Sequence, residues 1–154
     1  MCAVSCLAEF PQYISNLFIT QEVQENGLYR LRICKNGVWQ IVTIDDYFPC
    51  DTSTGTPVFS RANGNEIWVL LIEKAMAKLH QSYCALIGGD TSEALIDLSG
   101  APCTNFDLVE DHHVKNLIAN GQLWNLLRDY DRRKFLISAS TAEKQEDCHS
   151  SLVK

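Results

Sequence analysis

Hydrophobic and polar residues alternate along residues 28–33, and residues 38–44 are rich in β-branched and aromatic side chains. Asn36 and Gly37 stand between these two stretches, and an Asn-Gly pair in such a position is the strongest short-range signal of a β-hairpin. Two aspartates and Pro49 then end the second stretch. The pattern therefore predicts two antiparallel strands joined by a tight turn.

Apolar residues recur with a helical period in other parts of the chain. Residues 66–80 follow this period throughout and predict a helix of the core. Residues 1–10 carry small and apolar side chains on all sides, which predicts a buried helix that Pro11 interrupts. Two later stretches, 114–121 and 123–130, predict one or two further helices with a glycine break between them.

Turn-forming residues dominate two other segments. Residues 50–65 predict a long surface loop, in which residues 58–59 are the candidate for a short strand. Residues 86–100 predict a glycine-led loop and then a short helix capped by Thr91 or Ser92.

The two ends of the chain complete the picture of a mixed α+β fold. Residues 135–140 predict a final strand, and the polar residues 141–154 predict a loop. The helix at residues 1–10 has neither a capping residue nor an acidic first turn, so we expect it to begin outside this chain.

Composition limits the function classes that remain open. The chain has 154 residues and a net charge of -6, and its one basic cluster is interleaved with aspartates, which argues against binding to nucleic acid. No apolar run approaches the ~20 residues that a membrane-spanning helix needs. The first residues lack the basic start of a signal peptide, so we expect a cytoplasmic protein.

Seven cysteines without a Cys-x-x-Cys pair argue against both a disulfide framework and a zinc ribbon. Four of them are predicted to be small buried side chains or inert thiols: Cys34, Cys50, Cys84 and Cys103. Asp111, His112 and His113 suggest a metal, but neighbouring histidines without a spaced partner are weak evidence for one.

Two longer motifs carry a family resemblance. Residues 37–49 read Gly-Val-Trp-Gln-Ile-Val-Thr-Ile-Asp-Asp-Tyr-Phe-Pro, and residues 65–78 read Asn-Glu-Ile-Trp-Val-Leu-Leu-Ile-Glu-Lys-Ala-Met-Ala-Lys. Tyr83, a Gly-Gly pair at 88–89 and Leu-Ser-Gly at 98–100 follow in order. These motifs resemble the catalytic core of the calpains, which are papain-like cysteine endopeptidases.

The resemblance covers residues 1–105 well and residues 106–154 loosely. It implies an α+β papain-like fold with a central buried helix, further helices and a β-hairpin. The chain would be part of a calpain catalytic domain, mostly its first lobe, with residues 106–154 leading into the second. His80 and residues 100–103 and 49–51 are similar to the small-optic-lobes type of atypical calpain.

Calpain cores place the nucleophile in a Gly-Asp-Cys-Trp motif at the start of a helix, and residues 1–7 resemble the continuation of that helix. Residues 151–154 resemble the segment before the Gly-His-Ala-Tyr motif, which supplies the general base, and the orienting Asn comes later still. The resemblance therefore implies that all three triad members lie outside this chain and that the chain alone is inactive.

Cysteines inside the chain are candidates to replace the missing nucleophile. Cys2 and Cys6 lie one or two turns inside the predicted helix, where the helix dipole has faded and the thiol is buried, so a structural role is the better interpretation. His149 follows Cys148 directly and cannot be its spatially opposed base, so it is interpreted as a surface-loop histidine.

The resemblance also assigns roles to residues that are present. Gly88 and Gly89 match the paired glycines along which papain-like proteases lay the substrate backbone; a flexible turn is the alternative. Glu66 matches a carboxylate that helps bind calcium in conventional calpains, with partner ligands from outside this chain; a carboxylate facing the helix dipole is the alternative.

Two functions follow from these residues. The first is part of a calcium-dependent cysteine endopeptidase that cleaves protein substrates and works together with the remainder of the calpain core. The second is a catalytically inactive calpain-like module, or orphan fragment, that only binds or occupies space.

Overall fold

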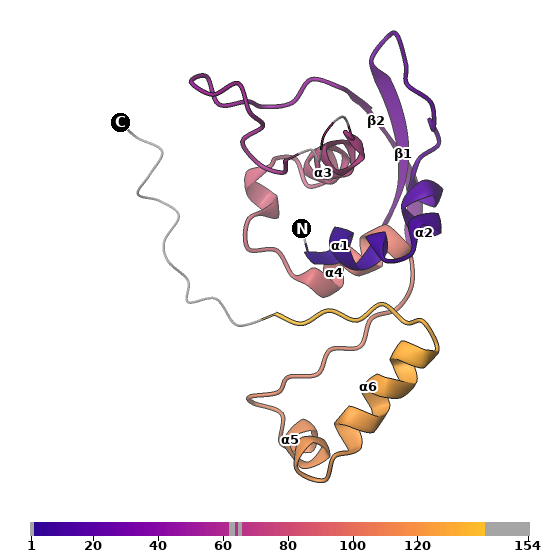
Figure 1. The fold of residues 1–154 in the computed structure, drawn as a ribbon, viewed down its shortest axis with the longest axis vertical. Helices are drawn as coiled ribbons and strands as arrows, with labels where there is room; N and C mark the ends of the chain where they lie inside the picture. The colour runs from indigo at the N-terminus through magenta and orange to yellow at the C-terminus, as the bar shows by residue number, and fades with distance from the viewer. Residues whose placement is uncertain (1, 62–63, 65, 141–154) are drawn as a thin grey trace.

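The computed structural model describes residues 2–61, 64 and 66–140 (Figure 1). Within these residues the fold is mixed α+β, with six α-helices, one short 3-10 helix and a two-stranded sheet. The elements follow in the order α1 (Cys2–Ala8), α2 (Pro11–Leu17), β1 (Leu28–Lys35), β2 (Val38–Asp45), α3 (Trp68–Leu79), η1 (Cys84–Leu86), α4 (Thr91–Ser99), α5 (His112–Ala119) and α6 (Gln122–Arg132).

Strands β1 and β2 form the predicted hairpin. They pair antiparallel from Leu28 opposite Asp45 to Lys35 opposite Val38. Asn36 and Gly37 have φ values of 52° and 76°, the left-handed conformation that a two-residue type I′ turn requires at both positions. The hairpin prediction is confirmed, including its turn.

The hairpin presents one apolar face to the core. Every second residue of the first part of β1 is buried, namely Tyr29, Leu31 and Ile33, and β2 adds Val42 and Ile44. The other edge of β1 is covered where Phe18 forms an isolated bridge with Leu31.

Helices α1 and α2 correct two predictions. Ala3, Val4 and Leu7 are buried on one face of α1, whereas Cys2 is exposed and Cys6 half-buried, so the helix is not buried on all sides. The stripe of these three apolar side chains is enough to pack α1 against the core, so its opposite face does not have to be buried. Pro11 does not only end α1; it is the first residue of α2, a position where its missing N–H costs nothing.

Helices α3 and α4 close the core over the hairpin. The prediction of a helix at residues 66–80 is confirmed as α3, with Ile72 and Ala75 fully buried. The predicted cap of α4 is wrong, because Asp90 is the N-cap and its carboxylate accepts a hydrogen bond from the Ser92 N–H at 2.8 Å. A carboxylate one residue before Thr91 satisfies the free N–H groups and interacts favourably with the helix dipole.

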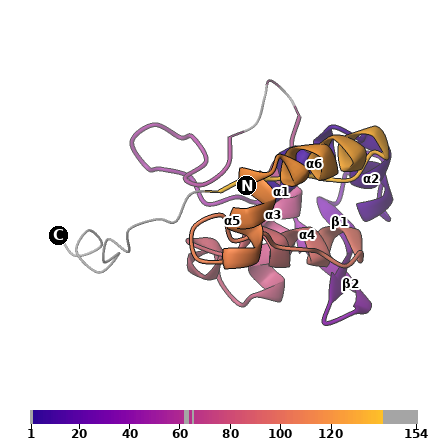
Figure 2. The same ribbon diagram turned by 90° about the horizontal axis from the view of Figure 1, so that it is seen from below.

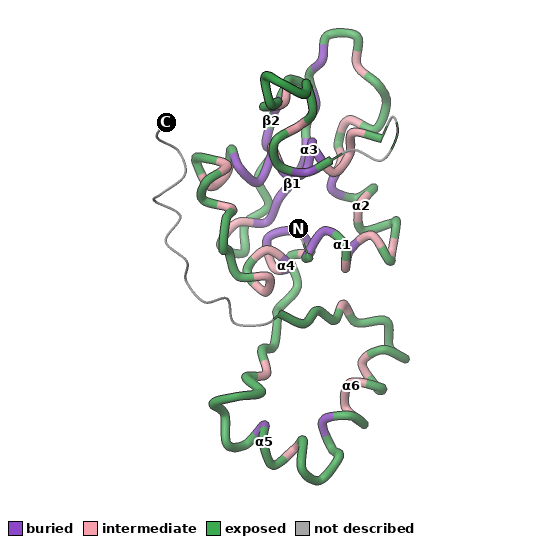
Figure 3. The backbone as a smooth tube through the Cα atoms, turned by 60° about the vertical axis from the view of Figure 1, so that its left-hand side comes forward, coloured by how far each residue is buried: buried purple, intermediate pink, exposed green. Residues whose placement is uncertain are grey.

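One cluster of buried side chains joins α1, α2, the hairpin, α3 and α4. Its members are Ala3, Val4, Leu7, Leu17, Tyr29, Leu31, Ile33, Val42, Ile44, Leu71, Ile72, Ala75, Met76, Leu95 and Leu98. Figure 3 shows the buried positions concentrated in these elements. Helices α1 to α4 and the hairpin therefore share a single core, against which Leu136 also packs.

Helices α5 and α6 contact each other and lie to one side of this unit, with most of their positions exposed (Figures 1 and 3). The predicted break between them is confirmed, since Asn120 ends α5 and Gly121, at φ 72°, precedes α6. None of the described helices is long and apolar enough to cross a membrane.

Two predicted strands are absent from the described residues. Val58 and Phe59 lie in a bend, and the isolated bridge of this loop joins Cys50 to Pro57 instead. Residues 135–140 have no regular structure, because no neighbouring strand is available to pair with them. The segment instead returns to α1, where the Cys6 thiol donates a hydrogen bond to the Ile137 carbonyl at 3.4 Å.

The end of α4 gives a test of this packing. Gly100 caps the helix at φ 69°, and a Cβ there would lie 2.7 Å from Cζ2 of Trp39. Gly121 has a similar φ of 72° but open space around it, so it is the matched control. We expect Gly121→Ala to lower the free energy of unfolding by about 1 kcal/mol from backbone strain alone, and Gly100→Ala to lower it by about 2 kcal/mol. Urea denaturation measures both, and equal losses would show that the Trp39 contact is unimportant.

Candidate substrate-binding site

Gly88 and Gly89 form an exposed stretch of bare main chain between η1 and α4. A Cβ built on Gly88, whose φ is 73°, would meet nothing within 4 Å, and one built on Gly89 would meet only the Leu86 carbonyl at 3.8 Å. Nothing in the described chain therefore covers this side of the backbone. An extended peptide can approach it closely enough for main-chain hydrogen bonds.

The glycine pair lies at one end of a helix pair. Helices α1 and α4 pack side by side and run in the same direction (Figures 1 and 2). Gly88 and Gly89 immediately precede α4, so they lie at the end of the pair where α1 also begins. The structure thus brings together two segments that are about 80 residues apart in the sequence and that the calpain resemblance places at one site.

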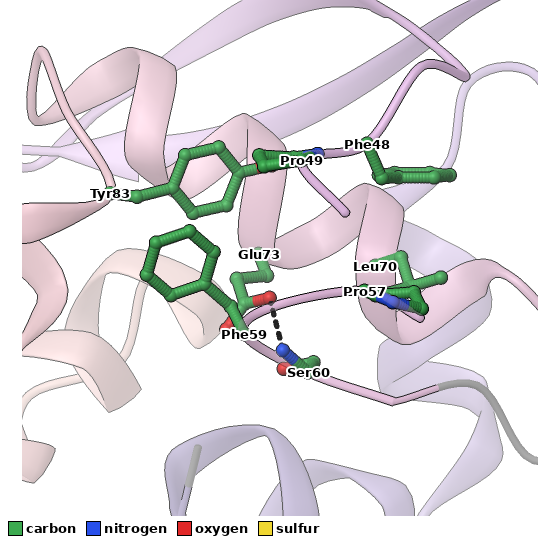
Figure 4. Close-up of a pocket in the computed structure, with 8 residues that line it drawn as sticks. All are labelled: Phe48, Pro49, Pro57, Phe59, Ser60, Leu70, Glu73 and Tyr83. Atoms are coloured by element: carbon green, nitrogen blue, oxygen red, sulfur yellow. Dashed lines mark hydrogen bonds between the residues drawn. The ribbon is translucent and has the colours of Figure 1, made fainter. Parts of the chain in front are cut away.

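Residues 80–90, which carry the glycine pair, are anchored to the core at several points. The ring of Tyr83 stacks on Phe59 with 4.5 Å between the ring centroids (Figure 4). His80 is the residue at which α3 ends, and Asp90 caps α4. The glycines therefore lie in a largely exposed segment that is fixed at Tyr83, at Leu86, which packs against the core cluster, and at the Asp90 cap.

The Phe59–Tyr83 stack belongs to a filled apolar cluster beside α3. Its centre is Glu73, a buried carboxylate whose Oε2 accepts a hydrogen bond from the Ser60 N–H at 2.9 Å (Figure 4). Burial first, then the nearby Glu73 and Asp45 carboxylates, raises the pKa of Tyr83. The lining residues leave no room for a water molecule, so this cluster anchors the loop and is not a ligand pocket.

A charged cluster ties together β1, the end of α3 and α4. Lys35 Nζ lies 2.9 Å from Asp97 Oδ2 and 2.9 Å from Glu93 Oε1. His80 Nε2 lies 3.2 Å from the same oxygen of Asp97 and 3.3 Å from Lys35 Nζ. The Asp97 side chain is only 4% exposed, so its charge is compensated inside the protein and not by water.

The electrostatics of this cluster stabilise the protonated form of Lys35 and the ionised form of Glu93. Burial by itself lowers the pKa of Lys35, but the hydrogen bonds to Glu93 and Asp97 outweigh it and the pKa is raised. The hydrogen bond from Lys35 holds the pKa of Glu93 below its usual value. The ion pairs therefore persist over the whole range in which carboxylates are ionised and lysine is protonated.

The described cysteines do not form a nucleophile site. Burial, followed by the charges of Glu9 and Cys2, raises the pKa of the Cys6 thiol, which is the reverse of what a reactive thiolate needs. None of the described cysteines is hydrogen-bonded to a histidine. The burial prediction is right for Cys34 but wrong for three others, since these lie on surface loops or the short η1 helix: Cys50, Cys84 and Cys103. Cys148 and His149 lie outside the described residues.

Glu66 lies on the surface two residues before α3, where its carboxylate accepts a hydrogen bond from Trp68 Nε1 at 3.2 Å. Among the described residues, no group of three His, Cys, Asp or Glu side chains could hold a metal ion. The carboxylate of Asp111 caps α5 through the His113 and Val114 N–H groups, which accounts for that residue without a metal.

Sequence reasoning missed the Lys35, Asp97 and Glu93 cluster. Lys35 and Asp97 are separated by 62 positions, and no local pattern relates them. One signal was available, since Glu93 and Asp97 are four residues apart on one face of a helix, where two like charges are unfavourable unless a cation lies nearby.

The cluster predicts a particular pH dependence of stability. The pKa of Lys35 is raised, so its contribution is complete below 10.5 and is lost as the pH rises through the raised value. The pKa of Glu93 is lowered, so its contribution is present above 4.5 and is lost as the pH falls through the lowered value. His80 Nε2 lies 3.3 Å from Lys35 Nζ, and imidazoles change charge between about pH 5 and 8. We therefore expect the stability difference between the unmodified protein and Lys35→Met to be constant from about pH 8 to 10 and to shrink above the raised pKa of Lys35 and below the lowered pKa of Glu93. A difference that peaks inside this range, measured by denaturant unfolding, would refute the assignment.

Comparison with known proteins places the chain in a family. The family model of the calpain family cysteine proteases matches residues 1–154. The chain is 40% identical over 152 residues to the calpain-type cysteine protease ADL1 of Oryza sativa subsp. japonica, covering 98% of this chain and 7% of that protein. It is 41% identical over 142 residues to the calpain-type cysteine protease DEK1 of Arabidopsis thaliana, covering 92% of this chain and 6% of that protein. Calpain-5 of Caenorhabditis elegans is 34% identical over 134 residues, 82% of this chain and 19% of that protein.

The chain spans only 6 to 7% of the length of the two plant relatives. The small-optic-lobes assignment stays a prediction, because these matches do not test it. The family assignment, by contrast, rests on a match to the whole chain and on relatives that are 34 to 41% identical. The chain belongs to the calpain family of cysteine proteases.

Proposed function

We propose that this chain is part of a calcium-dependent, papain-like cysteine endopeptidase and supplies a wall of the substrate-binding cleft. The observation that carries the proposal is the bare main chain of Gly88 and Gly89 at the end of the molecule where α1 begins, in a chain of the calpain family. The remainder of the calpain core would complete the cleft.

Protein substrates would bind along the glycine pair in an extended conformation. Main-chain hydrogen bonds to the wall would hold the peptide without reading its side chains, because the wall itself has none. The firm anchoring of residues 80–90 by Tyr83 and Asp90 supports this role, since a wall that moves cannot hold a peptide bond at the reacting geometry.

The chemical step needs a thiolate, a general base and an orienting group. The raised pKa of Cys6 and the lack of a cysteine–histidine hydrogen bond among the described residues support a triad of Cys, His and Asn outside this chain. This chain would then contribute to the reaction by positioning the substrate and by packing α4 against α1, the helix that the resemblance places directly after the nucleophile.

Calcium is expected in the complete protein, with Glu66 as one ligand. The described residues do not fit a complete site, because calcium takes about six to eight oxygen ligands and Glu66 offers one carboxylate that already bonds Trp68. The exposed free thiols of Cys2, Cys50 and Cys103 suit a reducing compartment, which supports a cytoplasmic location.

A catalytically inactive calpain-like module is the second candidate. The lack of a thiol–imidazole pair among the described residues fits this candidate equally well. The two candidates differ in whether the complete coding sequence contains Gly-Asp-Cys-Trp and Gly-His-Ala-Tyr motifs on either side of this chain.

Peptidase assays test the proposal directly. We expect the 154-residue chain alone to show no hydrolysis of casein at any calcium concentration. The full-length protein should hydrolyse casein with calcium, and Gly88→Val should raise its KM roughly tenfold by covering the bare main chain. Gly121→Val is the matched control, because Gly121 has nearly the same φ as Gly88, also has open space around it and lies between α5 and α6.

Two results would contradict the proposal. Hydrolysis by the 154-residue chain that is lost in Cys2→Ala or Cys6→Ala would make one of these residues the nucleophile. A full-length protein that carries both flanking motifs and yet never reacts with an epoxysuccinyl cysteine-protease probe would favour the inactive module.

A further inference from the structure

The charged cluster described above joins helix α4 to His80, the residue at which the loop with the glycine pair begins. The loop runs from His80, at the end of α3, to Asp90, the cap of α4. The hydrogen bond of 3.2 Å between His80 Nε2 and Asp97 Oδ2 joins the two helices that flank the loop. Lys35 Nζ lies 2.9 Å from the same Asp97 oxygen and 3.3 Å from His80 Nε2. Because that nitrogen cannot donate to Asp97 and accept from an ammonium at once, Asp97 is the shared partner of Lys35 and His80.

Partial burial strengthens the hydrogen bonds of this junction. The side chains of Asp97, Lys35 and His80 are 4%, 20% and 22% exposed, so water competes weakly for their hydrogen bonds. The fourth member, Glu93, is mostly exposed and completes the coordination of the ammonium from the solvent side. The cluster therefore joins the start of the loop to the body of α4, and the open glycine pair lies between these two points.

Helix α4 connects the cluster mechanically to the wall. Asp97 lies in the last turns of α4, a helix of nine residues, and Gly89 lies next to its N-cap. The Asp90 carboxylate bonds the Ser92 N–H at 2.8 Å, so the cap moves with the helix. A helix of this length moves as a rigid rod, and a tilt at Asp97 displaces Gly88 and Gly89.

We propose that Lys35, Asp97 and His80 are positioning residues that set the place of the Gly88–Gly89 wall for substrate binding. The inference rests on the proposed function of the wall. Hydrogen bonds to a peptide need donor–acceptor distances of about 2.7 to 3.2 Å, so a shift of the wall by ~1 Å removes them. The cluster touches neither the substrate nor the reacting atoms, and it acts only through α4 and the loop.

The first test is a kinetic comparison in the full-length protein. Asp97→Asn keeps the shape of the side chain and removes its charge. We expect it to raise KM for a peptide substrate about three- to tenfold while kcat changes less than about twofold, because binding along the wall is lost and the reacting groups are untouched. His80→Leu should act in the same direction, and His80→Gln, which keeps a hydrogen-bonding group, should restore much of the KM.

Lys74→Met is the matched control. Lys74 is 18% exposed, close to the 20% of Lys35, and it also joins α3 to the hairpin through a carboxylate. Its hydrogen bonds go to Asp45 and to the Tyr47 carbonyl, outside the loop of residues 80–90. We expect Lys74→Met to lower stability and leave KM unchanged, so that a general effect of destabilisation is separated from positioning.

A second test uses the substrate backbone. N-methylation of the substrate amides, one at a time, should raise KM at the position that bonds the wall. If Asp97→Asn acts through the wall, the two changes are not additive, and the variant has little further effect on the methylated peptide. A stability effect alone would give the same KM ratio for methylated and unmethylated peptides.

The outcomes distinguish the two proposals. If Gly88→Val and N-methylation both leave KM unchanged, the wall does not bind substrate and the proposed function fails. If these two changes raise KM but Asp97→Asn and His80→Leu do not, or if their effects are additive with N-methylation, the wall stands and the positioning role is overturned. A KM increase for Lys74→Met equal to that of Asp97→Asn would overturn it as well.

Discussion

Helix α4 contacts both α1 and strand β1, and the place of the candidate site depends on these two contacts. Leu95 and Leu98 bury their side chains in the cluster that includes residues of both partners. Asp97, on the same helix, forms its ion pair with Lys35 at the end of β1. Apolar packing therefore supplies the attraction between α4 and its neighbours, and the buried ion pair selects one register of the helix, because an unpaired Asp97 would be costly to bury.

This arrangement places well-packed residues and open main chain close together in residues 80–97. Tyr83 is stacked and Asp90 is hydrogen-bonded to α4, while residues 87–89 between them are exposed. A binding surface of this kind needs support from rigid elements, since open backbone has no packing of its own to hold it. The calpain family assignment rests on sequence, and the structure adds that the main chain of the two glycines is uncovered.

Local chemistry made the hairpin, α3 and the break between α5 and α6 predictable. Asn36 and Gly37 determine a two-residue turn by themselves, and the period of α3 extends over three turns. Residues 135–140 read as a strand but remain irregular, because a strand needs a partner that the local pattern does not reveal. The glycine wall came from a family motif, whereas the Lys35–Asp97 pair spans 62 positions and required the structure.

The central claim is that Gly88 and Gly89 form a substrate-binding wall, and hydrogen exchange tests it most directly. The full-length protein would be compared with and without a peptidyl epoxysuccinyl inhibitor, following the backbone amides of residues 84–91 by mass spectrometry. We expect slower exchange in this segment after inhibitor binding and unchanged exchange in residues 112–119 of α5. An enzyme that is fully labelled by the inhibitor, yet shows unchanged exchange in residues 84–91, would contradict the account.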